Sequence, residues 1–411
     1  MWDLNANYFR ALPEKTSLYS PAFYRLCTST VLFMASFGMI MPELPAHLEA
    51  LGGSQYIGLI IGVFTLAAFM SRFFSGRIAD LAGRRKVMII GSIVTAVAGF
   101  GYLVAAGVFS FLLLRFLHGF STGFRPTGTT AMLTDIVPAN RRGEALGYLG
   151  IAGNTGMAGG PVLGSWLAVE FGMDWMFVCS SLLGLASLWL TFGLPETLAK
   201  PRPIQWSDFN VFKGGIIDVR AWPAAIFLLP ISFAFGVFLT LTPDFVDHLG
   251  YVYKGSFNTI IVGSAIAVRF FAGRASDKYG RVPLLLMGAI LLATGMGILS
   301  IAETKTMATI GGVIYGLSIG INMPTIFAWT ADLASEGKVA VALGTMLMAL
   351  EIGIGWGAVQ SGLTYGGEVA NITFMYSLCS AFGVLSTLGL VYALFRMNKG
   401  RGKKVGIAGG V

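Results

Sequence analysis

The chain has 411 residues, of which 55% are hydrophobic and 12% are Lys, Arg, Asp or Glu. This charged share is about half of that in soluble domains, and a bilayer core is crossed by ~20 apolar residues. Twelve such segments would use roughly 240 residues. That leaves no room for a nucleotide-binding domain, a kinase domain or another soluble motor.

Hydropathy predicts twelve apolar segments separated by short polar connections. The longest connection, 195–221, carries three prolines and divides the segments into two groups of six. We therefore predict an all-α membrane protein with twelve transmembrane helices in two pseudo-symmetric six-helix bundles, 23–194 and 222–395, joined by a cytoplasmic linker at 195–221. The segments lie at roughly 23–49, 56–76, 86–106, 110–137, 143–170, 174–194, 222–248, 256–274, 282–302, 306–333, 338–364 and 370–395.

Two short segments flank the bundles. Residues 1–22 lack the pattern of a removable signal peptide, so we interpret them as a cytoplasmic segment at the membrane surface. Residues 396–411 form a basic cytoplasmic tail. With both termini inside, most of the 28 Lys and Arg residues fall on the cytoplasmic side, as the positive-inside rule requires. The net charge of +8 is then an orientation signal, and nucleic acid is not an expected partner.

The two halves contain an internal repeat. Residues 72–80, RFFSGRIAD, recur as 269–277, RFFAGRASD, and the same offset aligns Asp135 with Asp332. It also places Glu351 at the position that Asn154 occupies in the first half. Two parallel copies related by an axis along the membrane normal enclose a site at their interface, an arrangement used for alternating access.

The stretch 76–86, GRIADLAGRRK, resembles the loop signature between helices 2 and 3 of the major facilitator superfamily, with a degenerate copy at 273–281. The resemblance implies the major facilitator fold and a loop that clamps the cytoplasmic side while the protein faces outward. We expect Gly76 and Gly83 to permit close backbone approach in a tight turn. An alternative is that the basic cluster only sets the orientation. The residues expected in this conformational gate are Gly76, Asp80, Gly83, Arg84, Asp135, Gly273, Asp277, Gly280 and Arg281.

Further stretches resemble the twelve-helix drug:proton antiporter branch of this superfamily. They are 38–45 (GMIMPELP), 114–120 (LRFLHGF), 156–165 (GMAGGPVLGS) and 194–197 (LPET), with departures at Glu43, His118 and Ser165. Gly156, Gly160 and Gly164 recur every four residues and predict a small-residue packing face, and Pro161 predicts a bend in the helix. That this bend enforces antiport is implied by the resemblance alone.

Charged residues at membrane depth indicate an interior cavity. Arg115, His118 and Arg125 share one face of segment 110–137, so we predict a polar stripe that lines the cavity. We predict that Glu351 is a coupling carboxylate, because a carboxyl group in a low-dielectric site can titrate near neutral pH. The alternative for Glu351 is a permanent salt bridge with Arg115 or Arg125.

Glu43 and Asp244 form a second candidate pair near the outer surface. Each follows a proline and stands four residues before a histidine. Such a pair can attract a cation or a metal, but we favour solvated charges at helix ends and predict no metal site. The three cysteines have no CxxC spacing and no neighbouring histidine, so neither a disulfide nor a zinc site is expected.

The resulting prediction is a secondary active transporter that exports small amphipathic molecules or drugs in exchange for protons. The alternatives are proton-coupled uptake of a sugar or organic anion, and a non-transporting receptor of the same fold. No catalytic spacing such as HExxH or GxSxG is present, so we predict no enzyme activity and no cofactor beyond the proton gradient. The expected partners are a small-molecule substrate, protons and the lipid bilayer, with a monomeric protein in a bacterial inner membrane.

Overall fold

The computed structural model describes residues 19–138, 141–203, 205, 218–334 and 339–408, and the regular structure of these residues is helical. Twelve of the described helices have 20 residues or more, as predicted. They are α1 (Pro21–Ile40), α3 (Ile57–Ala82), α4 (Arg84–Leu103), α5 (Val108–Ile136), α6 (Arg142–Glu170), α7 (Met173–Phe192), α8 (Trp222–His248), α9 (Gly255–Tyr279), α10 (Arg281–Ser300), α11 (Lys305–Leu333), α12 (Val339–Tyr365) and α13 (Val369–Ala408). The short elements are α2 (Leu44–Ala50), η1 (Ser54–Tyr56) and η5 (Val219–Ala221).

Most of these helices are long and apolar enough to cross a membrane. Among the described residues nine meet that criterion, or ten if α9 counts as one span, since α9 bends by 46° between Arg269 and Phe271. Helices α5 and α6 are not among them, because buried arginines and many glycines lower their hydropathy. The pattern is that of a multi-pass integral membrane protein.

The first predicted span, 23–49, is wrong as a single helix. Helix α1 ends at Ile40, a turn follows, and the short helix α2 begins at Leu44. Pro42 has no backbone N–H to continue the helix, whereas Pro45 fits the first turn of α2.

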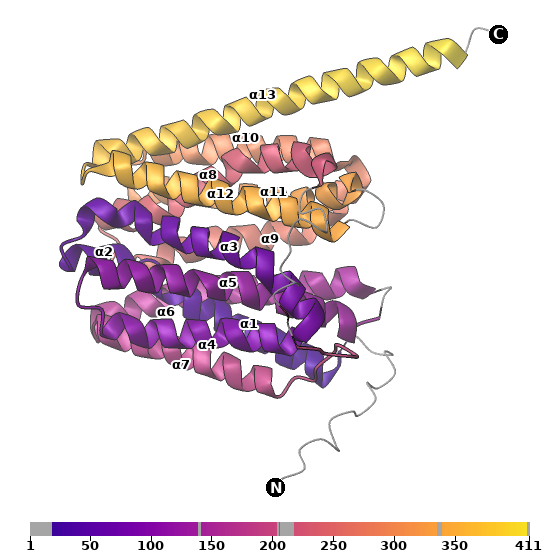
Figure 1. The fold of residues 1–411 in the computed structure, drawn as a ribbon. Coiled ribbons are helices and arrows are strands. Elements are labelled where there is room, and N and C mark those ends of the chain that lie inside the picture. The colour runs from indigo at the N-terminus through magenta and orange to yellow at the C-terminus, as the bar shows by residue number, and fades with distance from the viewer. Residues whose placement is uncertain (1–18, 139–140, 204, 206–217, 335–338, 409–411) are drawn as a thin grey trace.

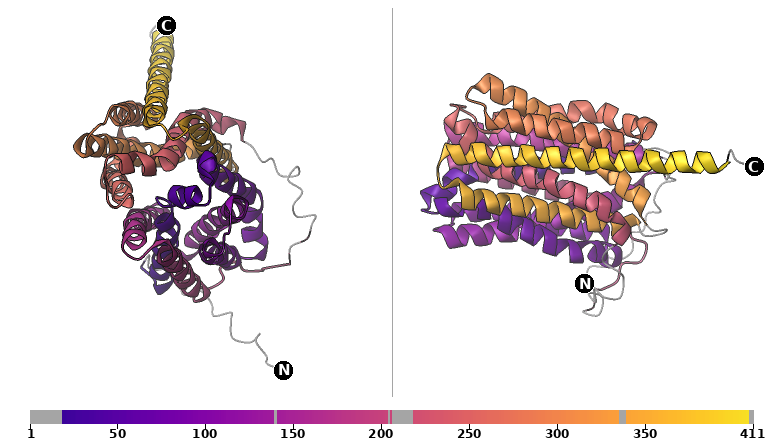
Figure 2. Two further views of the ribbon diagram at one scale, coloured as in Figure 1. Left: turned by 90° about the vertical axis from the view of Figure 1, so that its left-hand side faces the viewer. Right: turned by 90° about the horizontal axis from the view of Figure 1, so that it is seen from above.

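The helices form two bundles that lie side by side (Figures 1 and 2). Helices α1 to α7 make the first bundle and α8 to α13 the second, and each has its own buried apolar clusters. One cluster of the first bundle also takes in Ile354 and Ala358 of α12. The bundles meet where α3 packs on α12 and where α6 packs on α9.

The two ends of the molecule differ in charge. We call the end where α3 meets α4 and α9 meets α10 the basic end, and the opposite end, which carries α2, the α2 end. At the basic end a single glycine separates the helices of each pair: Gly83 has φ 125° and Gly280 has φ 92°. Side chains with a Cβ rarely adopt these angles, so glycine permits both turns.

The predicted boundaries at the chain ends are tested only in part. Helix α13 continues to Ala408, beyond the predicted span end at 395, whereas the part of it that is apolar enough to cross a membrane is Val369–Tyr392. Its 40 residues extend over about 60 Å, and the helix projects past its neighbours at the basic end (Figure 1). The predicted segment 1–22 lies outside the described residues up to residue 18, as do residues 204 and 206–217 of the linker.

Candidate functional site

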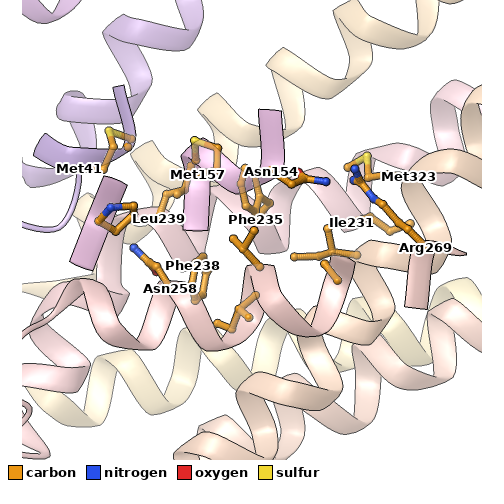
Figure 3. A pocket seen from close by; sticks show the side chains of 16 residues that line it. Met41, Asn154, Met157, Ile231, Phe235, Phe238, Leu239, Asn258, Arg269 and Met323 are labelled. Carbon is orange, nitrogen blue, oxygen red and sulfur yellow. The ribbon is translucent and has the colours of Figure 1, made fainter. Parts of the chain in front are cut away.

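A pocket of about 210 Å³ lies between the two bundles (Figure 3). Its first wall comes from α1, the following turn and α6, and its second wall from α8, α9 and α11. The lining is mostly apolar and includes Met41, Met157, Phe235, Phe238 and Met323. Methionine and aromatic side chains of this kind adapt to apolar molecules of different shape.

Three polar side chains interrupt this apolar lining: Asn154 of α6, and Asn258 and Arg269 of α9. Each has a buried polar atom without a protein hydrogen-bond partner, namely Asn154 Nδ2, Asn258 Oδ1 and Arg269 Nε. Figure 3 shows Asn154 and Arg269 toward one end of the pocket and Asn258 toward the other. Sequence reasoning did not select Arg269 or Asn258 as site residues.

Close helix contacts close the pocket toward the α2 end. A Cβ added to Gly58 of α3 would lie 2.5 Å from the carbonyl oxygen of Ala358 and 2.9 Å from Cα of Gly362, both on α12. On the other side of the pocket, the backbone N–H of Gly255 donates to Ser165 Oγ at 2.8 Å, joining α9 to α6. At Gly58 and Gly255 the helices are too close to admit a larger side chain.

The interface between the bundles is less tightly packed toward the basic end. A Cβ added to Gly76, Gly147, Gly273 or Gly344 would meet no atom within 4 Å. The expectation that Gly76 permits a close backbone approach is therefore wrong for this conformation, since Gly76 lies within α3 and the tight turn forms at Gly83. Close backbone contacts between the bundles are therefore found around the α2 end, whereas added Cβ atoms at these four positions meet no atom, and the Arg72–Glu351 ion pair links α3 to α12 between the two regions.

Arg84 is the centre of a polar network at the basic end of the first bundle. It forms ion pairs with Asp80 at 3.2 Å and with Asp135 at 3.1 Å. Its backbone N–H donates to Glu196 Oε1 at 2.9 Å, and Thr197 Oγ1 donates to Asp135 at 2.7 Å. Glu196 thereby supplies a carboxylate to the N-terminus of α4, where a negative charge is stabilising.

The second bundle repeats this network in part. Arg281 forms ion pairs with Asp332 at 2.8 Å and with Asp277 at 2.5 Å. The residue at the position matching Glu196 is Ala393, which has no carboxylate. The expected gate residues of each half therefore lie together, and the first half has an additional carboxylate that the sequence reasoning did not assign.

Arg115 and His118 do not line the pocket, contrary to the prediction. Both are fully buried inside the first bundle. Arg115 donates from Nε to the carbonyl oxygen of Ile60 at 3.1 Å and lies over the ring of Phe64. His118 Nδ1 lies 3.3 Å from the Tyr102 hydroxyl.

Arg125 is also enclosed by the first bundle rather than exposed to the pocket. Its guanidinium donates to Thr191 Oγ1 and Ser29 Oγ at 2.9 Å each, and to Ser92 Oγ. These hydroxyl groups come from α7, α1 and α4, which surround α5. The face that carries the predicted polar stripe points into the bundle, where hydroxyl and carbonyl groups accept hydrogen bonds from the arginines, although Arg125 Nε has no partner.

Glu351 lies at the interface between the bundles and pairs with Arg72. The Arg72 guanidinium donates to Glu351 Oε1 at 2.5 and 3.1 Å, linking α3 to α12. The prediction that any salt bridge of Glu351 would involve Arg115 or Arg125 is wrong. Periodicity could not identify Arg72, because the sequence alone does not show which helices of the two halves meet.

Glu43 is buried, with 5% of its surface exposed, so the interpretation as a solvated charge is wrong for this residue. Its Oε1 accepts a hydrogen bond of 2.5 Å from Ser165, the same hydroxyl that accepts from Gly255 of the other bundle. Asp244 is half-buried and neighbours Lys254. Within the described ranges, no group of three or more His, Cys, Asp or Glu side chains is placed to hold a metal.

The glycine face of α6 packs against α1. Added Cβ atoms at Gly156, Gly160 and Gly164 would collide with the backbone of Val31, Ala35 and Met39. Helix α6 continues through Pro161, which lies in the pocket wall.

The model of the Major Facilitator Superfamily matches residues 26–358, which is most of the chain. The chain belongs to the major facilitator superfamily. It is a membrane transporter and not an enzyme.

Relatives within this superfamily carry efflux names. The chain is 29% identical over 336 residues to a "Multi-drug resistance efflux pump PmrA homolog" of Lactococcus lactis, covering 78% of this chain and 82% of the relative. It is 25% identical over 316 residues to the "Quinolone resistance protein NorA" of Staphylococcus aureus, covering 74% and 80%. The structure of the xylose transporter XylE from E. coli superposes with a TM-score of 0.73 at 15% identity, over 89% of this chain and 95% of that chain, which shows a common fold.

Proposed function

We propose that this transporter exports small amphipathic molecules in exchange for protons, with its basic end in the cytoplasm. The observation that carries the proposal is the apolar pocket between the bundles, which takes its walls from both halves of the repeat. A pocket shared by two halves can open to either side when the halves rock. The efflux names of the relatives favour export.

The described conformation corresponds to the state of this cycle in which the α2 end is closed. The bundles touch at Gly58 and Gly255 near the α2 end, whereas a Cβ added at Gly76 or Gly273 near the basic end meets no atom within 4 Å. With the basic end in the cytoplasm, a substrate enters the pocket from inside in this state. Rocking that brings the two bundles together at the basic end would then separate the contacts at the α2 end and release the substrate outside.

Glu43 is the carboxylate that we propose to couple this motion to protons. It is buried beside Ser165 at the closed end, and no cation forms an ion pair with it among the described residues. An unpaired carboxylate is costly to bury when ionised. Protonation from outside therefore favours closure of the α2 end, and loss of the proton favours its opening. Glu351 differs, because Arg72 compensates its charge.

Proteoliposomes that contain pyranine test the proposal. Under an imposed pH gradient, addition of a probe that is exported should drive protons in the opposite direction to the probe. The probes to be compared are ethidium, which is cationic, Nile red, which is neutral, and 8-anilino-1-naphthalenesulfonate, which is anionic. Proton movement in the same direction as the probe would indicate uptake instead, and a probe that binds without any flux would indicate a receptor.

Variants then separate coupling from folding. Glu43→Gln should retain probe binding but lose accumulation driven by the pH gradient, by at least tenfold. Glu351→Gln should retain the pH dependence, since its role is a fixed ion pair. If Glu43→Gln follows the pH gradient as the parent protein does, Glu43 is not the coupling group.

A further inference from the structure

The repeat relates two arginines at the interface between the bundles. Arg72 of α3 and Arg269 of α9 begin the two copies of the repeated motif. Their partners across the interface also correspond, because Glu351 of α12 and Asn154 of α6 occupy matching positions. Helix α3 packs on α12, and α6 packs on α9. The same interhelical contact therefore occurs twice with different chemistry.

In the first contact the charges balance. Arg72 and Glu351 lie 2.5 Å apart, and the carboxylate neutralises the guanidinium. In the second contact the carboxylate is replaced by an amide. The guanidinium of Arg269 reaches α6 beside Gly150, with NH1 3.9 Å from a Cβ built there, one helical turn from Asn154.

No acidic side chain of the described residues forms an ion pair with Arg269, and none lines its pocket. Its Nε and the Asn154 Nδ2 are both buried without a protein acceptor. Figure 3 shows both side chains in the wall of the pocket. An arginine in an apolar cavity retains its charge, and a guanidinium binds carboxylates through paired hydrogen bonds.

We propose that Arg269 and Asn154 form the anion-binding end of the pocket, and that the substrates are small amphipathic organic anions. A carboxylate of the substrate takes the place that Glu351 takes at the equivalent contact. The apolar body of the substrate packs between Phe235, Phe238 and Met157. This inference rests on the proposed function of the pocket as the substrate site.

Two probes of the same shape test this assignment: 1-naphthylacetate and 1-naphthylacetamide differ in charge but share the aromatic body. Their binding to the purified protein in nanodiscs is measured by equilibrium dialysis. The parent protein should bind the acetate at least tenfold more tightly than the amide, as expected for a charge-assisted hydrogen bond.

Three variants locate the source of that preference. Arg269→Gln should abolish it, whereas Arg274→Gln, which removes the same charge from an exposed position on the same helix, should preserve it. Asn154→Glu keeps Arg269 but gives it an acidic partner, as Glu351 is for Arg72. The new carboxylate should occupy the guanidinium, so this variant should also lose the preference for the acetate. This third variant gives a result even if Arg269→Gln fails to fold.

The outcomes separate this inference from the proposed function. Equal binding of the two probes by the parent protein, or a preference retained in both Arg269→Gln and Asn154→Glu, would overturn the anion site. Dialysis requires no transport, so a preference that depends on Arg269 without any flux in proteoliposomes would support the site and refute the export proposal. Coupled flux without a preference that depends on Arg269 would support the export proposal and refute the anion site.

Discussion

The contact between α3 and α12 at the α2 end gives a quantitative prediction. A Cβ at Gly362 would lie 2.5 Å from the backbone nitrogen of Gly58 and 2.6 Å from its Cα, where ordinary contacts are 3.4–4 Å. Gly362→Ala therefore forces the two helices apart by about 1 Å. Overpacking of this kind costs about 1–3 kcal/mol. The cost falls on the state that is closed at the α2 end.

A free-energy shift of that size changes the ratio of the two states by about 5- to 150-fold. The change appears as a longer distance between spin labels on the two bundles at the α2 end. Phe171 and Val252 are exposed there, 57% and 66% respectively, and suit labelling after replacement of the three native cysteines. Double electron–electron resonance should show the longer distance gaining population in Gly362→Ala.

Gly76→Ala is the matched control. It adds the same methyl group within a helix, at a position where a Cβ meets nothing within 4 Å. The described state tolerates this substitution, so the distance at the α2 end should not lengthen. A distance distribution in Gly362→Ala identical to that of the parent protein would refute the inference that this contact closes the pocket.

Two further predictions concern the polar contacts. Glu351→Gln should destabilise the fold by about 1–3 kcal/mol, because the partly buried Arg72 loses its charged partner. The charge swap Arg72→Glu with Glu351→Arg should recover part of this loss in thermal unfolding, and a swap no better than the single variants contradicts the pairing. Glu196→Gln should lower stability by about 0.5–2 kcal/mol through weaker capping of α4. Glu144→Gln, which removes exposed contacts with Arg141 and Tyr19, should lower the melting temperature less, and equal losses in both variants would exclude the capping role.

The sequence predicted the architecture because apolar length and an internal repeat are local signals. Twelve long helices follow from hydropathy, and the repeat predicts two equivalent halves. The break after Ile40 was missed because the apolar pattern continues across Pro42 into α2. The extension of α13 was missed because its last residues are basic, and hydropathy alone does not indicate a helix outside the membrane.

The candidate site was harder to predict, because it depends on which helices meet. Arg115 and Arg125 share a helix face, but periodicity does not show whether that face points to the pocket or into its own bundle. Arg269 was counted only as part of the repeated motif, although it lines the pocket. The repeat aligns Glu351 with Asn154, but this exchange singles out Arg269 only once the contacts of α3 with α12 and of α6 with α9 are known.

Access to the pocket from each side of the membrane tests the central claim most directly. A cysteine introduced for Ile319, which lines the pocket, is treated with a membrane-impermeant maleimide applied separately to each side. Alternating access predicts reaction from the basic-end side in the described state, and increased reaction from the α2 side in Gly362→Ala or when the pH gradient is reversed. Reaction from one side alone under every condition would contradict the account.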